Sequence, residues 1–192
     1  MPRLKPVTIE NGSAEQKKVL EGVKARLGKV PNIYATMAQS STTLAAFLQY
    51  GEALKKGVLS AKEIESIALA VGQENSCDYC LAAHTMMGKG AGLSDAEVLS
   101  ARRGEGKDPR MQALLAFSVD LVRSKGWPSQ EAVKGMRAAG YTEGAIVEAT
   151  AWVAFNLFTN YFNHVAGTEL DFPKAKDLEE ERGCGAGCCC SG

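Results

Sequence analysis

Apolar residues recur along this chain at intervals of three and four positions, which is the spacing of one face of an α-helix. In the segment that follows Ser13, for example, this spacing is kept by Val19, Leu20, Val23 and Leu27. No segment between turn signals alternates apolar and polar residues as a strand does. The pattern therefore predicts an all-α protein, a compact array of short helices.

Capping residues and glycines mark the ends of the predicted helices. Ser60, with Glu63 three residues later, has the form of a capping box, and Ser76 is predicted to cap the helix that follows it. Most of the 20 glycines fall where a helix is expected to end. On these signals we expect helices over residues 13–28, 32–39, 42–57, 60–75, 76–88, 94–99, 109–126, 129–139 and 142–164.

The composition of the chain changes at Pro173. With 192 residues, of which 45% are hydrophobic and 23% charged, the chain is long enough to bury one core. After Pro173 the sequence is charged up to Arg182 and then rich in glycine and cysteine. We therefore expect one helical domain over residues 1–172 and a flexible tail over residues 173–192.

Charge and hydropathy exclude several classes of partner. Lys plus Arg and Asp plus Glu each number 22, and a net charge of zero argues against nucleic acid as the main partner. No apolar run approaches the ~20 residues of a membrane span, and residues 1–11 lack the apolar stretch of a signal peptide. We expect a cytoplasmic protein with no nucleic-acid or membrane partner. In that reducing setting a Cys-x-x-Cys pair indicates redox or metal chemistry.

Two of the six cysteines, Cys77 and Cys80, form such a pair. They fall in the predicted first turn of a helix, where unpaired backbone N–H groups favour an anion, and His84 lies on the same face. Lowering a thiol pKa by two units requires about 2.7 kcal/mol. A helix N-terminus supplies only ~0.3–2 kcal/mol, so a basic partner such as His84 must contribute. Glu65, on the preceding antiparallel helix, is placed to orient that imidazole.

Zinc is the competing interpretation of the same four residues. Zinc sites usually combine a Cys-x-x-Cys pair with a distant second pair of ligands, and the predicted domain has no such second pair. The spacing therefore favours redox chemistry over a metal site.

The spacing Glu65-x11-Cys77-x2-Cys80-x3-His84, within "LSAKEIESIALAVGQENSCDYCLAAH", resembles the signature of the alkylhydroperoxidase D-like proteins of the carboxymuconolactone decarboxylase superfamily. The segments "LGKVPNIYATMAQSSTTLAAFLQYGEAL" before it and "GLSDAEV" after it resemble the peroxidase-related branch. The similarity is strongest over residues 27–99 and extends to residue 172. It implies an all-helical alkylhydroperoxidase D-like fold that forms homo-oligomers, often trimers or hexamers.

The resemblance also implies an activity, the thiol-dependent reduction of alkyl hydroperoxides or of disulfides by an antioxidant, peroxidase-type enzyme. By position, Cys80 resembles the attacking thiol, and Cys77 resembles the partner that closes the disulfide and meets the external reductant. His84 and Glu65 resemble the proton relay. No cofactor is implied beyond a thiol reductant, which is a protein or a low-molecular-weight thiol. Tyr79 stands where some members carry a histidine, and the branch that decarboxylates generally lacks the cysteine pair.

Four further cysteines lie outside the resemblance, in the last nine residues: Cys184, Cys188, Cys189 and Cys190. Four thiols in so short a segment can wrap a soft ion such as Cu(I), Zn(II) or a metalloid. A metal- or metalloid-handling protein is therefore the alternative function. The same thiols can instead act as a tethered reductant for the Cys77–Cys80 disulfide, or can have no fixed role.

A weak internal repeat is also present in the sequence. Glu65 precedes the cysteine pair by 12 and 15 residues, and Glu148 precedes Asn160 and Asn163 by the same intervals. Both glutamates follow a predicted N-cap. The spacing suggests two related helical pairs, of which only the first keeps reactive side chains.

Overall fold

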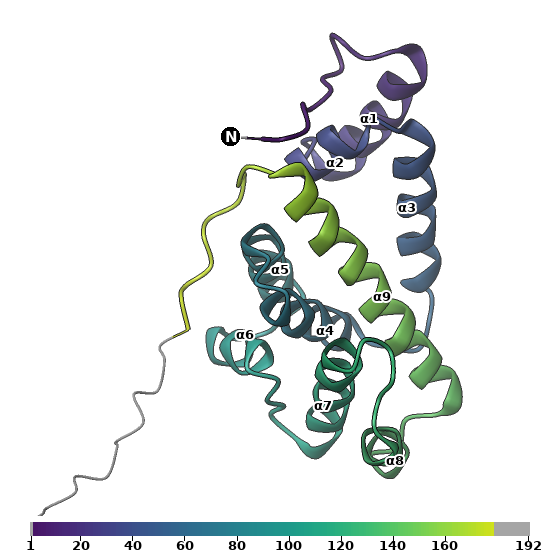
Figure 1. The fold of residues 1–192 in the computed structure, drawn as a ribbon, viewed down its shortest axis with the longest axis vertical. Helices are drawn as coiled ribbons and strands as arrows, with labels where there is room; N and C mark the ends of the chain where they lie inside the picture. Colours follow the sequence, from purple (N-terminus) through teal and green to yellow (C-terminus); the bar gives the residue numbers. More distant parts are fainter. Residues whose placement is uncertain (1, 179–192) are drawn as a thin grey trace, which may run out of the picture.

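The structure, a computed structural model, describes residues 2–178, and these residues fold into nine helices without a strand (Figure 1). The helices are α1 (Ala14–Leu27), α2 (Asn32–Met37), α3 (Ser41–Leu54), α4 (Ala61–Glu74), α5 (Asp78–Gly90), α6 (Asp95–Arg102), α7 (Pro109–Arg123), α8 (Gln130–Ala138) and α9 (Glu143–Ala166). Each corresponds to a helix expected from the sequence, and the predicted all-α fold is confirmed. The domain boundary at residue 172 stays a prediction.

Helix α4 is the centre of the fold, because α5, α6, α7 and α9 all pack against it. It begins with the predicted capping box, in which Ser60 and Glu63 exchange hydrogen bonds between side chain and backbone. Its residues from Glu65 to Gly72 are all buried. A helix that is buried on every side must satisfy each of its polar side chains inside the protein. Glu65 therefore lies in the interior, where its carboxylate needs a hydrogen-bonding partner within the protein.

Helix α9 is the longest helix, with 24 residues between its Thr142 N-cap and its Gly167 C-cap. Figure 1 shows it crossing the molecule diagonally, with α3 on one side and α4 and α5 on the other. Glu148 and Asn160 both lie on this single unbroken helix, whereas the first copy of the suggested repeat is split between α4 and α5. The repeat as two helical pairs is therefore wrong.

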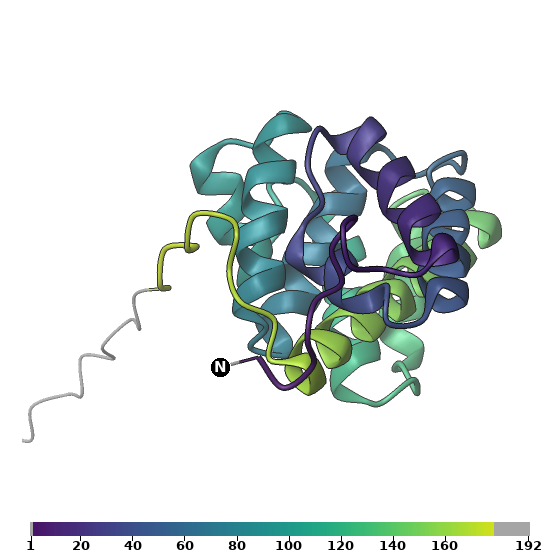
Figure 2. The same ribbon diagram turned by 90° about the horizontal axis from the view of Figure 1, so that it is seen from above.

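The N-terminal segment packs against the end of α9, and the segment that follows α9 runs on along the helical core (Figure 2). The backbone N–H of Arg3 donates to the carbonyl of Ala166 over 2.7 Å, at the end of α9. The segment that follows α9 then contacts α2, because the Asn32 side chain donates to the carbonyl of Glu169. No helix of residues 2–178 is both long enough and apolar enough to span a bilayer.

Candidate active site

The turn between α4 and α5 uses only three residues. Ser76 adopts a left-handed backbone conformation with φ of 52°. Its N–H donates to the carbonyl of Gln73 over 3.0 Å, and the N–H of Cys77 donates to that of Gly72 over 2.9 Å. This is a Schellman ending of α4, in which glycine is the usual residue at the position of Ser76. Cys77 is also the N-cap of α5, so the prediction that Ser76 caps this helix is wrong.

This turn brings the two predicted thiols together. The Sγ atoms of Cys77 and Cys80 lie 2.8 Å apart, and both cysteines are free. A disulfide bond requires a separation of about 2.05 Å, so it can form with a small movement of the side chains. Cys77 is 1% exposed and Cys80 is 3% exposed. The pair is therefore poised to form a disulfide in a site shielded from bulk solvent.

The two thiols differ in acidity. The hydrogen bond with Cys80 lowers the pKa of the Cys77 thiol below its ordinary value, because it outweighs the burial that acts in the opposite direction. The same contact, together with burial, raises the pKa of Cys80. The first negative charge of the dithiol therefore rests on Cys77, and Cys80 becomes a nucleophile only after it gives up its proton.

The predicted proton relay is present between α4 and α5. Oε2 of Glu65 lies 2.8 Å from Nδ1 of His84, and both side chains are largely buried. A carboxylate at Nδ1 orients the imidazole and favours the tautomer that carries its proton there. The other ring nitrogen, Nε2, is then available to accept or return a proton.

Cys80 and His84 line a common cavity of about 300 Å³, whereas Cys77 does not line it. The cavity lies between the ends of α1 and α3, helix α5 and helix α9. Its walls are mainly apolar and include Ile33, Tyr34, Phe47, Met87, Trp152 and Phe155. Charged side chains lie at its edge, where Arg26 pairs with Glu52 over 2.7 Å. The cavity therefore offers an apolar organic molecule a path to Cys80.

Tyr79, which separates the two cysteines from within the motif, is turned away from the sulfur atoms. Its hydroxyl donates to Oδ1 of Asp171 over 2.7 Å and accepts from the N–H of Ile33 over 3.3 Å. Burial and the bond to Asp171 raise the pKa of Tyr79, so the hydroxyl stays protonated. Tyr79 therefore fastens the segment after α9 beside the site and takes no part in a relay.

Asn163 is the residue that the sequence did not mark as part of the site. Its side-chain amide donates to Sγ of Cys80 over 3.2 Å and lies 3.9 Å from Sγ of Cys77. One turn away, Oδ1 of Asn160 accepts from the side chain of Asn75 over 3.0 Å. A signal was available, because α9 carries buried asparagines at Asn156, Asn160 and Asn163, and buried amides need polar partners.

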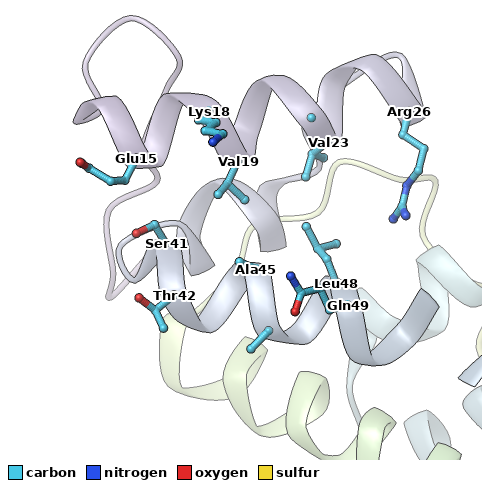
Figure 3. A pocket seen from close by; sticks show the side chains of 12 residues that line it. Glu15, Lys18, Val19, Val23, Arg26, Ser41, Thr42, Ala45, Leu48 and Gln49 are labelled. Carbon is cyan, nitrogen blue, oxygen red and sulfur yellow. The ribbon is translucent and has the colours of Figure 1, made fainter. Parts of the chain in front are cut away.

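A second concavity, of about 760 Å³, lies between α1 and α3 (Figure 3). It is lined by Lys18 and Val23 on α1 and by Ser41 and Ala45 on α3. Arg26 lines both this concavity and the cavity in front of Cys80, so the two adjoin there. None of the residues predicted to carry chemistry lines the concavity.

The C-terminal cysteines, Cys184, Cys188, Cys189 and Cys190, lie outside the described residues, and their metal-binding role stays a prediction. Within residues 2–178, no group of three or more His, Cys, Asp or Glu side chains is arranged to hold a metal ion.

Comparison with known proteins gives both a family match and a shared fold. Residues 42–105 match the profile of the carboxymuconolactone decarboxylase family, and no curated protein sequence matches the chain. An alkylhydroperoxidase AhpD core, an uncharacterized peroxidase-related protein from Ralstonia eutropha JMP134, has a similar structure. Its TM-score is 0.79 at 22% identity, with 88% of this chain and 92% of that chain covered.

Two other solved structures share the fold. An uncharacterized peroxidase-related protein from Silicibacter sp. TM1040 has a TM-score of 0.74 at 22% identity and covers 88% of this chain and 94% of its own. The debrominase Bmp8 has a TM-score of 0.74 at 19% identity, with 88% of this chain and 92% of the debrominase chain covered. The match over residues 42–105 and the shared fold together confirm what the sequence motif indicated, that this chain resembles the alkylhydroperoxidase D-like proteins of the carboxymuconolactone decarboxylase superfamily.

Proposed function

We propose that this protein is a thiol-dependent peroxidase that reduces organic hydroperoxides at Cys80, with Cys77 as the thiol that closes the disulfide. One observation carries the proposal. Cys80, whose sulfur lies 2.8 Å from that of Cys77, shares the wall of an apolar cavity with the Glu65–His84 pair. The superfamily resemblance supports the same peroxidase-related chemistry.

In the first step the Cys80 thiolate attacks an oxygen of the hydroperoxide. Cys80 first passes its proton to His84, which the Glu65 carboxylate stabilises as an imidazolium. The O–O bond then breaks, a sulfenic acid forms on Cys80, and the alcohol leaves with the proton that His84 returns. The sulfur is oxidised and the peroxide is reduced by two electrons.

In the second step the Cys77 thiolate attacks the sulfenic sulfur of Cys80. The S–O bond breaks, and the hydroxide that leaves takes up the proton that the Cys77 thiol has lost, so that water is released. Cys77 is the thiol of the reduced pair whose pKa is lowered, which suits it to attack as a thiolate. The product is the Cys77–Cys80 disulfide, which a thiol reductant must reopen.

The apolar walls of the cavity favour small organic substrates. A disulfide on the surface of a folded protein cannot approach Cys80, which is 3% exposed. A debrominase has been solved in complex with 2,3,4-tribromopyrrole, which shows that a protein of this fold binds a small aromatic molecule. Reduction of a low-molecular-weight disulfide uses the same two sulfur atoms and is the competing activity.

The test is consumption of cumene hydroperoxide with dithiothreitol as the electron donor. We expect turnover by the native chain and a loss of at least about 10³-fold in Cys80→Ser, because removal of a nucleophile has effects of this size or larger. A circular dichroism spectrum of the variant controls for folding. Full activity in Cys80→Ser would refute the proposal. A higher kcat/KM for oxidised glutathione or 2,3,4-tribromopyrrole than for the hydroperoxide would reassign the substrate.

A further inference from the structure

The outer face of α9 carries apolar side chains at the spacing of a coiled coil. Intervals of four and three residues alternate along it, as they do between the a and d positions of a heptad repeat. This α9 stripe consists of Val147, Ala151, Ala154, Phe158, Tyr161 and Val165. At about 100° per residue, the six positions fall within about 80° of the helix circumference, opposite the buried asparagines of the same helix.

The α9 stripe lies open to solvent. Val147 is 69% exposed, Phe158 41%, Tyr161 58% and Val165 60%, and Ala154 is also exposed. From residue 149 to residue 168 the sequence contains no Asp, Glu, Lys or Arg. The outer face of a surface helix normally carries such charges, and a helix that is apolar on every side is normally buried. Since the described residues cover only the inner face of α9, its outer face requires another cover.

Helix α3 extends this uncharged surface. It lies beside α9 (Figure 1), and Tyr50 of α3 contacts Phe155 of α9 with 5.8 Å between the ring centroids. Before Glu52, α3 has no charged residue, and its exposed positions next to α9 again alternate between three- and four-residue intervals: Thr43, Ala46, Tyr50 and Ala53. The exposed side chains of both helices amount to roughly 600 Å², and specific interfaces bury about 600–1,000 Å² on each partner.

The α9 stripe is complementary to itself when a second copy lies antiparallel to it. In that arrangement each a position faces a d position of the other helix. Ala151 then faces Tyr161 of the second copy, Ala154 faces Phe158, and the valines at the two ends of the stripe face each other. Each aromatic side chain is therefore opposite an alanine, which allows the two layers to interdigitate. A parallel pairing would instead place Phe158 against Phe158 and Ala154 against Ala154, with a clash in one layer and a gap in the next.

We propose that two copies of this protein associate through their α9 stripes, antiparallel to each other about a two-fold axis that passes between Ala154 and Phe158. The exposed positions of α3 lie at the flank of this contact. The family resemblance predicted homo-oligomers without indicating the surface that forms them. A two-fold contact builds a dimer or, together with a three-fold axis, a hexamer, whereas a cyclic trimer contains no such contact.

The proposed interface lies directly behind the cavity of the candidate active site. Phe47 and Phe155 line the cavity and stack on each other with 4.2 Å between their ring centroids. Phe158 contacts Phe47 over 5.6 Å, and Tyr50 contacts Phe155. Because Phe158 and Tyr50 are themselves exposed, the second copy covers the outer side of this part of the cavity wall.

Charged substitutions at the two ends of the stripe test both the surface and the direction of pairing. Val147 and Val165 are largely exposed, and about 27 Å of helix separates them, so new charges there neither enter the core nor pair within one chain. In the antiparallel arrangement, Val147→Lys with Val165→Glu places opposite charges together at both ends. The matched control, Val147→Lys with Val165→Lys, places like charges together, which opposes association.

The measurement is the mass in solution, determined by sedimentation velocity on full-length chains kept reduced so that no intermolecular disulfide contributes. We expect the native protein to contain an even number of chains. The lysine–glutamate variant should keep the native mass and the lysine–lysine variant should have half of it, with circular dichroism as the control for folding. A native monomer or trimer, or a lysine–lysine variant of native mass, would overturn the proposal. Dissociation of both variants would overturn the antiparallel pairing.

Photo-cross-linking provides a second test, which locates the contact. With p-benzoylphenylalanine in place of Tyr161, irradiation of mixed isotope-labelled and unlabelled chains should yield a mixed-isotope product linked near Ala151. The same amino acid in place of Trp127, which is 85% exposed between α7 and α8, should give no link to α9. Absence of the link from position 161 to α9 would overturn the proposal. Neither test involves the thiols, so the result is independent of the proposed peroxidase activity.

Discussion

Two glutamates of this protein stand at the same spacing before a pair of residues, and the structure uses them differently. Glu65 on α4 faces His84 on α5 over 2.8 Å and borders the cavity of Cys80. Glu148 on α9 turns outward from its own helix, and its Oε2 accepts hydrogen bonds from the backbone N–H groups of Val58 (2.7 Å) and Leu59 (3.3 Å). The first glutamate serves chemistry and the second fastens the connection between α3 and α4.

The difference arises from a single break in the helix. The turn at Ser76 folds α5 back along α4, so that Glu65 meets a side chain that follows the cysteines. In α9 the helix continues, and twelve residues at 1.5 Å each keep Glu148 and Asn160 about 18 Å apart. The unbroken helix instead delivers Asn163 to the two sulfur atoms. The regions are therefore complementary parts of one site rather than two copies of it.

Among the substitutions that distinguish the two regions, Glu65→Gln is expected to have the largest effect on activity. The amide keeps a hydrogen bond to His84 but cannot stabilise the imidazolium, so we expect kcat to fall about 10²-fold, the lower end of the range for general acid–base catalysis. The measurement is steady-state turnover of cumene hydroperoxide. Unchanged kcat would remove the Glu65–His84 pair from the mechanism.

Glu148→Gln is the matched substitution in the other region. We expect activity within twofold of the native value, because Glu148 touches neither the cavity nor the thiols. The free energy of unfolding should fall by about 1–3 kcal/mol, since hydrogen bonds to a charged group are weakened. Urea denaturation measures this change. A large loss of activity with unchanged stability would contradict the division of roles between Glu65 and Glu148.

A smaller effect is expected from Asn163→Leu, which removes the amide that connects the two regions. Asn163 contributes to the lowered pKa of Cys77, so the variant should hold that pKa closer to its ordinary value of 9.0. Below this pKa Cys77 keeps its proton and attacks the sulfenic acid of Cys80 more slowly, so activity rises with pH through it. The acid limb of the pH–rate profile should therefore move to higher pH in the variant, with a loss of about tenfold near neutrality. An unmoved limb would separate Asn163 from the ionisation of Cys77.

The smallest effect, a change in the free energy of unfolding, is expected from a substitution in the turn between α4 and α5. Ser76→Gly should relieve the left-handed conformation and raise the free energy of unfolding by about 0.5–1 kcal/mol with activity retained. Gly167→Ser, at the left-handed cap of α9, should lower it by a similar amount. Thermal unfolding of the two variants gives the comparison, and a destabilised Ser76→Gly would indicate that the serine side chain supports the turn.

The parts of the site that the sequence predicted depend on local spacing. The helical period placed Cys77, Cys80 and His84 close together on one element, and the antiparallel arrangement expected for α4 and α5 placed Glu65 opposite His84. The capping serines marked most helix starts because their role depends on the next three residues. The start of α3 was expected at Thr42, and the helix begins one residue earlier, at Ser41 after the Ser40 cap.

The parts that were not predicted depend on contacts between residues far apart in the chain. Asn163 lies 83 positions from Cys80 in the sequence, and no periodic pattern relates the two. The shielding of Cys77 follows from the packing of α9 and of the N-terminal helices around it, whereas its lowered pKa follows first from the local hydrogen bond with Cys80. Ser76 was misjudged because one serine can end a helix or begin one, and the backbone hydrogen bonds decide which.

The three-residue turn between α4 and α5 also fixes a register. One residue inserted into α4 between Glu65 and Gly72 would rotate the turn and α5 by about 100° about the α4 axis relative to Glu65 and advance them by about 1.5 Å. His84 would then point away from Glu65, and Cys80 away from its cavity, even if every side chain were kept. The proposed chemistry therefore depends on the number of residues between Glu65 and Cys77, which is eleven. The length of this segment is constrained more strongly than its composition.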